Sequence, residues 1–182
     1  MIFTIFESDD QPFLFPLNQM KASFELRCGA FTNLDRIKNS IKKNDEIHLF
    51  VRPELKDLVQ ERYPNLKVNP AFLSEGVWLN GAAVWSETSI EGVASKKTYT
   101  NKGKILALHC EESIPLDLAL DYIKKSASVS IEFHLPFIHN SWDAIFLQSK
   151  LISIDAFEFV DLRHGRLHPS AIMENPDNIF IG

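Results

Sequence analysis

Short apolar runs typical of buried strands alternate with amphipathic helical patterns along most of the chain. The strand-like runs are residues 2–6, 47–51, 66–68, 77–79 and 105–108. The helical patterns are residues 31–43, 53–63, 117–125 and 142–151. Parallel strands need crossover connections, usually helices, so this order predicts an α/β domain with a mainly parallel sheet and helices on both faces. Ligands of such sheets usually bind outside the carboxyl ends of the strands.

Several local signals refine this prediction. Thr32, with Asp35 three residues later, is a candidate helix N-cap, and Pro53 suits a first helical turn. Asn80-Gly81 is a turn signal after a strand. Residues 86–104 are polar and lack apolar periodicity, which favours a mobile excursion or a hairpin.

Length and charge limit the classes of protein. The chain has 182 residues, a net charge of −5 and two cysteines, Cys28 and Cys110, which we expect to be buried small hydrophobes. One domain is the default at this length. Lys and Arg are scattered, so a nucleic-acid footprint is missing. The longest apolar runs fall far short of the roughly 20 residues of a membrane span, and the first residues lack the basic start of a signal peptide, which predicts a cytoplasmic protein without a membrane partner.

The end of the chain has a pattern of its own. Residues 167–172 read LHPSAI, which fits the hexapeptide form of a left-handed parallel β-helix, and residues 179–182 end on the Ile-Gly pair with which such a hexapeptide often begins. One coil alone cannot bury its apolar face. On these residues alone, a terminal hairpin around residues 176–178 is the preferred interpretation.

The stretch at residues 16–29 reads PLNQMKASFELRCG. It resembles the N-terminal signature of the GlmU-like sugar nucleotidyltransferases, approximately P-L-T-x-T-R-P-x-x-E-L-R-x-G. Later landmarks of that family follow in the same order at residues 51–53, 62–64, 79–81, 142–143, 168–172 and 179–182.

The resemblance implies a Rossmann-like domain of the nucleotide-diphosphosugar transferase type at residues 1–166. It also implies that residues 167–182 begin a left-handed β-helix, with the terminal hairpin as the alternative. The chain then has the form of a family member cut at that boundary or of a natural short form.

The resemblance further implies sugar nucleotidyl transfer, in which a sugar 1-phosphate attacks a nucleoside triphosphate and releases pyrophosphate. Mg²⁺ is the cofactor that this chemistry implies, because charge neutralisation is its main catalytic need. The alternative is a non-catalytic domain that keeps the fold and orients a β-helical acyltransferase-like domain or a second copy of itself, as a homo-oligomer.

The catalytic candidates are Arg27 and Lys21. Arg27 falls at the family's second arginine position, where a guanidinium grips phosphate in a bidentate manner. The structural alternative is that Arg27 pairs with Glu25 or caps the following helix. Lys21 falls where the family has the arginine of its T-R-P step, and the alternative is a solvated loop lysine.

The remaining candidates are assigned to substrate and metal. The resemblance places Asn80, Gly81 and Trp142 at the substrate, and Asp143 and Asp10 at the metal. Asn80 stands where well-studied nucleotidyltransferases have an aspartate ligand, and an amide is a weaker ligand for a hard cation.

Each carboxylate has a structural alternative. Asp9 and Asp10 also suit a turn, and Asp143 also suits the first turn of a helix. His164 and His168 have the spacing of a helical zinc site, but Gly165 and Pro169 argue against a helix there.

The region after the first strand lacks the glycine-rich loop with which well-studied sugar nucleotidyltransferases wrap a triphosphate. No glycine occurs between Met1 and Arg27. This absence favours the non-catalytic alternative, although the GlmU-like subgroup also lacks the loop.

Overall fold

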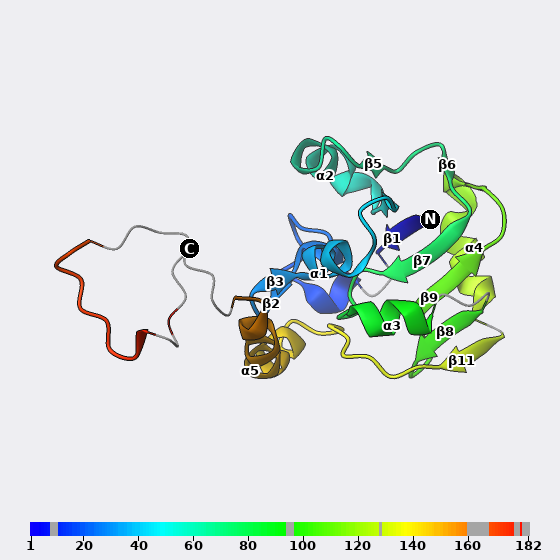
Figure 1. The fold of residues 1–182 in the computed structure, drawn as a ribbon. Coiled ribbons are helices and arrows are strands. Elements are labelled where there is room, and N and C mark those ends of the chain that lie inside the picture. The colour runs from blue at the N-terminus through cyan, green and yellow to red at the C-terminus, as the bar shows by residue number, and fades with distance from the viewer. Residues whose placement is uncertain (8–10, 94–96, 128, 160–167, 177–178, 180–182) are drawn as a thin grey trace.

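A computed structural model describes residues 1–7, 11–93, 97–127, 129–159, 168–176 and 179 of the chain. Its centre is a seven-stranded sheet (Figure 1). In spatial order the strands are β11 (Ser130–Glu132), β8 (Thr98–Asn101), β9 (Lys104–Cys110), β7 (Gly76–Asn80), β1 (Ile2–Phe6), β4 (Glu46–Phe50) and β5 (Lys67–Val68).

Most strand pairs in this sheet are parallel. β1 pairs in parallel with β4 and β7, β4 with β5, and β8 with β11. β9 runs antiparallel to both of its neighbours. The mainly parallel Rossmann-like sheet predicted from the sequence is therefore confirmed. Two small antiparallel pairs, β2 (Arg27–Cys28) with β3 (Phe31–Thr32) and β6 (Phe72–Leu73) with β10 (Ile114–Pro115), lie outside it.

Helices cover both faces of the sheet, as the sequence predicts. The α-helices are α1 (Asn33–Ser40), α2 (Lys56–Arg62), α3 (Glu87–Gly92), α4 (Ala119–Ser126) and α5 (Asp143–Asp155). Short 3₁₀ turns are η1 (Gln11–Leu14), η2 (Ser23–Glu25), η3 (Pro53–Leu55), η4 (Leu116–Leu118) and η5 (Ala156–Phe159).

The alternation of side chains along the strands builds two cores. Ile5 of β1 packs into the core that includes residues of α1, α2 and α3, whereas Phe6 faces the core that includes residues of α4. This period of two is expected for strands buried on both faces. A third, smaller core lies under α5, where Leu151 packs with Cys28 of β2. Cys28 and Cys110 are both buried and free, as predicted.

The predicted cap of the first helix is confirmed. The Thr32 side chain accepts from the Asp35 backbone N–H at 3.1 Å, and the Asp35 carboxylate accepts from the Thr32 backbone N–H at 3.1 Å. This reciprocal capping box satisfies two of the donors that every helix start leaves free. The helix ends at Ser40, three residues before the predicted end.

Residues 86–104 contain the hairpin that was one of two predictions, together with a helix that was not predicted. β8 and β9 are joined by Lys102 and Gly103, whose positive φ values of 49° and 78° suit a two-residue hairpin loop. α3 precedes the hairpin and begins at a capping box formed by Ser86 and Ser89. Its six residues are too few to show a helical period in the sequence.

A buried ion pair fixes α5 to the rest of the domain. The Arg36 guanidinium of α1 makes two hydrogen bonds of 2.6 Å to the Asp155 carboxylate, which also accepts from the Ala30 backbone N–H at 2.7 Å. Both charged side chains are buried. The hairpin of β2 and β3 is thereby held between α1 and α5.

The C-terminal prediction concerns residues that are only partly described. The boundary between residues 166 and 167 lies outside the described residues, and no strand occurs within 168–176. The first β-helical coil at residues 167–182 and its hairpin alternative both stay predictions. Within the described part of the chain, no helix is long and apolar enough to cross a membrane.

Candidate active site

A cavity of about 500 Å³ opens at the carboxyl ends of β1, β4 and β5. Its charged lining residues are Glu7, Arg52 and Asp117, and its apolar walls include Phe50 and Leu120. This is the edge at which ligands bind in sheets of this type. Among the described residues that line the cavity, Arg52 is the one cation.

Glu7 directly follows β1, is buried, and lines the cavity. One carboxylate oxygen accepts from the Ser23 backbone N–H at 2.9 Å and from Arg52 Nη1 at 2.8 Å. The other oxygen accepts from the Arg52 backbone N–H at 3.1 Å. Burial raises the pKa of the Glu7 carboxyl, and the charge and hydrogen bonds of Arg52 oppose that rise without cancelling it.

Arg52 directly follows Val51 at the end of β4 and connects three segments. Besides its bonds to Glu7, its guanidinium donates to the Asn18 carbonyl oxygen. Its side chain keeps 22% of its surface exposed. A guanidinium that is held by a buried carboxylate and still reaches a cavity is well placed to receive an anionic ligand group.

Asn69 completes the cavity wall next to β5. Its side-chain oxygen accepts from the Val51 backbone N–H at 2.9 Å and its amide donates to the Val51 carbonyl at 2.8 Å. The Asn69 amide thus makes the two hydrogen bonds that a neighbouring strand would make with the N–H and carbonyl groups of Val51, the residue before Arg52. Its φ of 47° is one that Asn adopts more readily than most residues.

The segment that contains Lys21 lies over the end of β1. Lys21 is exposed, whereas Ala22, Ser23 and Phe24 are buried. A second ion pair holds this segment: the Arg62 guanidinium of α2 lies 3.0 Å and 3.1 Å from the two carboxylate oxygens of Glu25. Lys21, the lysine that the family resemblance assigns to phosphate, therefore lies on a segment whose backbone is held in place.

Arg27 lies in β2, exposed to solvent, and its guanidinium donates to the Ala30 carbonyl of its own hairpin. Of its structural alternatives, pairing with Glu25 is not found, because the Glu25 carboxylate bonds to Arg62. The N-cap of the following helix is Thr32.

Trp142 and Arg27 line one open groove of about 940 Å³ along α5. The Trp142 side chain is 54% exposed. The structure therefore brings together two of the predicted site residues, but neither is among the residues that line the cavity beside Glu7 and Arg52.

Asn80 and Gly81 are parts of the framework at the end of β7. The Asn80 side chain is fully buried, donates to the Ile105 carbonyl at 2.8 Å and accepts from the Ala82 backbone N–H at 3.0 Å. A Cβ atom at Gly81 would lie 2.8 Å from Cβ of Phe24, so the close approach of the two segments requires glycine. Substrate binding by these two residues stays a prediction.

The metal prediction rests on Asp143 and Asp10. Asp143 begins α5, and one of its carboxylate oxygens accepts from the backbone N–H groups of His139 at 2.9 Å and Asn140 at 2.7 Å. This is the first-turn interpretation that the sequence left open. Asp10 lies outside the described residues, as does Asp9.

The fit of Mg²⁺ can be tested on the described carboxylates. Both oxygens of Glu7 and one oxygen of Asp143 are already hydrogen-bonded to the protein. Among the described residues, no group of three His, Cys, Asp or Glu side chains is arranged to hold a metal ion. The described residues therefore contain no preformed cluster of three protein ligands, and of the two carboxylates only Asp143 has an oxygen outside these hydrogen bonds.

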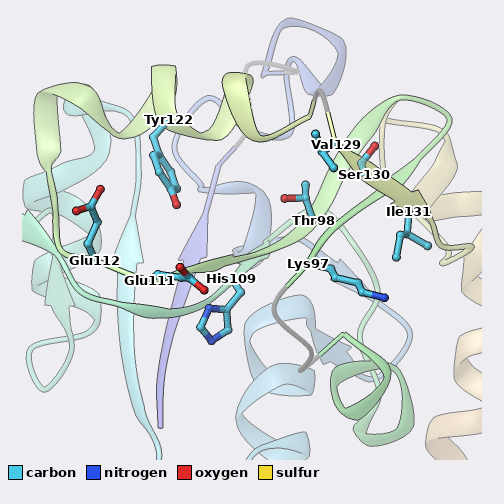
Figure 2. A pocket seen from close by; sticks show the side chains of 9 residues that line it. All are labelled: Lys97, Thr98, His109, Glu111, Glu112, Tyr122, Val129, Ser130 and Ile131. Carbon is cyan, nitrogen blue, oxygen red and sulfur yellow. The ribbon is translucent and has the colours of Figure 1, made fainter.

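A further cavity of about 790 Å³ lies between α4 and the strands β8, β9 and β11 (Figure 2). Glu111 and Glu112, which line this cavity, directly follow Cys110 at the end of β9. Cys110 pairs with Gly76, the first residue of β7, so the cavity lies at the end of the sheet where the parallel strands β7, β1 and β4 begin. Arg52 lies at the other end, where these strands finish.

The lining of this further cavity has two carboxylates, Glu111 and Glu112, against one lysine, Lys97. The first cavity has the same ratio of two carboxylates to one cation, so charge does not distinguish the two cavities. The further cavity differs in its position, because it lies away from the carboxyl ends of the parallel strands, where ligands of such sheets usually bind.

Glu7 and Arg52 were not identified from the sequence as two of the charged residues that line the cavity at the carboxyl ends of β1, β4 and β5. Glu7 and Arg52 are 45 positions apart, and their contact depends on the parallel pairing of β1 with β4. The available signal was that each directly follows the end of a strand run. Arg52 lies within the family landmark at residues 51–53, to which the sequence assigns no function.

One family of known proteins matches most of this chain. The family described as "Sugar nucleotidyl transferase" matches residues 3–163. No curated protein matches. A solved structure from Bacillus anthracis, assigned as a glucose-1-phosphate thymidylyltransferase, is 9% identical with a TM-score of 0.47, covering 91% of this chain and 98% of that one. The CTP:phosphocholine cytidylyltransferase LicC from Streptococcus pneumoniae is 12% identical with a TM-score of 0.44, covering 82% and 99%.

Proposed function

We propose that this chain, which belongs to the sugar nucleotidyl transferase family, joins a nucleoside triphosphate to a sugar 1-phosphate and releases pyrophosphate. The family match over residues 3–163 is the observation that carries the proposal. The cavity at the carboxyl ends of β1, β4 and β5 supports it, because it combines apolar walls for a nucleoside with the Arg52 guanidinium for its phosphates. The cytoplasmic location predicted from the sequence is part of the proposal.

Three cations share the phosphate binding in this proposal. Arg52 faces the cavity, Lys21 lies on the segment that covers the end of β1, and Arg27 lines the groove beside Trp142. Transition-state charge in nucleotidyl transfer spreads over phosphate oxygens, so fixed cations supply the main stabilisation. The contact of Trp142 with the substrate, which the family resemblance implies, is also part of the proposal.

The test is release of pyrophosphate from each common nucleoside triphosphate in the presence of hexose and hexosamine 1-phosphates. We expect release that requires both substrates. Arg52→Met should weaken nucleotide binding about tenfold or more, as expected for loss of a charged hydrogen-bonding partner. Lys97→Met, at the opposite end of the sheet, is the matched control and should leave binding unchanged. No turnover with any pair, and no thermal shift with any nucleotide, would contradict the proposal.

Mg²⁺ dependence is the finer part of the proposal. We infer that Asp10, and Asp143 with its second oxygen, are the carboxylates to test as ligands, because Mg²⁺ takes only one or two from a protein. Removal of Mg²⁺ with EDTA should abolish turnover and its return should restore it. Asp10→Asn should raise the Mg²⁺ concentration needed for half-maximal rate. A rate that is unchanged by EDTA would rule out the requirement.

A second candidate function, self-association as a non-catalytic domain, is favoured by the outer face of α5, which consists of the exposed apolar residues of α5 and of its two flanks, Trp142 and η5. Trp142, Ile145, Phe146 and Phe157 are 54%, 74%, 77% and 79% exposed. The three aromatic residues alone leave about 300 to 500 Å² exposed. Each partner buries about 800 Å² in a standard interface, and the three residues supply roughly half of that area. Light scattering should show a dimer that Phe146→Glu converts to a monomer, whereas Val129→Glu should not. A monomeric wild-type chain would exclude this function.

A further inference from the structure

The segment from Asn18 to Glu25 is held over the end of β1 by side chains of other segments together with its own Glu25 carboxylate. At its beginning, Arg52 donates to the Asn18 carbonyl oxygen. Near its end, the Glu7 carboxylate accepts from the Ser23 backbone N–H at 2.9 Å. Arg52 and Glu7 bond to each other at 2.8 Å, so one ion pair fixes both ends of the segment.

A second ion pair holds the middle of the segment. The Arg62 guanidinium donates to the Met20 carbonyl oxygen at 2.8 Å, and the Glu25 carboxylate accepts from the Ala22 backbone N–H at 2.8 Å. Arg62 and Glu25 bond to each other at 3.0 Å. Glu25 is 6% exposed and Arg62 is 34% exposed, so the pair is partly shielded from solvent.

Lys21 lies between the two residues that this second pair holds, Met20 and Ala22. The backbone on both sides of it is thus fixed, while its side chain is exposed. Each ion pair is internally neutral, so the pairs fix the backbone without adding net charge beside the lysine. An ammonium group presented from a fixed backbone loses less conformational entropy on binding an anion than one on a free loop.

We propose that Glu25 and Arg62 are positioning residues for Lys21 and hold its ammonium group where it binds a substrate phosphate. This inference rests on the proposed function. It also accounts for a phosphate-binding segment without glycine. None occurs between Met1 and Arg27, and ion-paired side chains order the segment in place of backbone amides that wrap the phosphate.

A double-mutant cycle on nucleotide and sugar 1-phosphate binding tests the inference. Lys21→Met and Arg62→Leu should each weaken binding of the same phosphate ligand about tenfold, and the double variant should bind no more weakly than either single variant. Arg62→Lys, which keeps the charge but not the planar fork, should recover part of the affinity. Lys56→Leu, at the first turn of the same helix, is the matched control and should bind normally. Additive losses in the double variant would overturn the inference.

Cleavage by a lysine-specific protease gives a readout that does not need activity. Ala22 is fully buried, so cleavage after Lys21 requires the segment to open locally. Arg62→Leu or Glu25→Gln should accelerate cleavage at this bond while the melting temperature and cleavage elsewhere change little. Unchanged cleavage at Lys21 would overturn the inference even if binding were lost.

The two proposals fail in different ways. If the wild-type chain neither binds a phosphorylated substrate nor releases pyrophosphate, the proposed function fails and the assignment of Lys21 fails with it. Accelerated cleavage in the variants would then leave the two residues with a structural function alone. If the wild-type chain is active but the cycle is additive, only the positioning inference fails.

Discussion

At the scale of single residues, Gly29 shows how one position supports several elements. Its φ is +83°, and a Cβ atom there would collide with the Asp155 carboxylate and lie 2.7 Å from Nη2 of Arg36. Gly29→Ala should lower the free energy of unfolding by about 3 kcal/mol or more, from the positive φ together with displacement of the buried ion pair. Urea denaturation measures this loss.

Gly103 provides the control for that substitution. Its φ is +78°, but no atom lies within 4 Å of a Cβ placed there. Gly103→Ala should therefore show the backbone cost alone, about 1 to 2 kcal/mol. Equal losses of unfolding free energy at both positions would mean that the collision of the new Cβ at residue 29 with the ion pair adds nothing to the cost.

Single residues were predictable from the sequence where their partners are local. The Thr32 and Asp35 cap joins residues three apart, and it was found from the pattern alone. The Asn80 amide donates to the Ile105 carbonyl of β9, a partner that only the sheet order brings near, and its contact with substrate stays a prediction. Charged side chains that meet across two strands, as those of Glu7 and Arg52 do, are not marked by any regular spacing along the sequence.

At the scale of elements, the edge pairing of β4 with β5 carries a pH-sensitive contact. The Glu46 carboxylate lies 2.7 Å from Lys67 Nζ and 2.9 Å from His48 Nε2. Hydrogen bonds from Lys67, then from His48, lower the pKa of Glu46 from 4.5 to about 2. An acid with a lowered folded-state pKa contributes stability above its ordinary pKa and loses it as the pH falls towards the lowered value.

Glu46→Gln should therefore flatten the pH dependence of stability. The wild-type melting temperature should fall more steeply than that of the variant between pH 4.5 and 2, and the difference should shrink in high salt because the carboxylate is about half exposed. Glu54→Gln on η3 is the control and should follow the wild-type curve. Parallel curves for Glu46→Gln and the wild type would contradict the assignment.

Elements with strong patterns were predictable, and short or polar elements were not. β1, β4 and β7 are apolar runs buried on both faces, which the sequence shows directly. β11 is three exposed residues and α3 is six residues held by a serine cap, so neither has an apolar period to detect. Their existence depends on the neighbours against which they pair or pack.

At the scale of the whole molecule, the alternation of strands and helices predicted the parallel sheet but not its antiparallel member. β9 follows β8 through a two-residue loop and so must run back beside it, which places an antiparallel strand inside the sheet. The loops that follow β1 and β4 meet at the cavity because both strands run in the same direction. The location of the candidate site was therefore predictable, whereas the residues that line it were not.

The division of the chain into residues 1–166 and 167–182 leads to a prediction about the whole molecule. The described residues 168–176 are mostly exposed, and His168 bonds within that stretch to Ser170 and Ala171. Deleting residues 167–182 should therefore shift the melting temperature by less than about 2 °C, because the described part of this stretch buries little surface and such segments contribute little to stability. Calorimetry of the two chains measures this shift. A fall of more than about 5 °C would show that the segment packs against the domain, as a coil anchored to the outer face of α5 would.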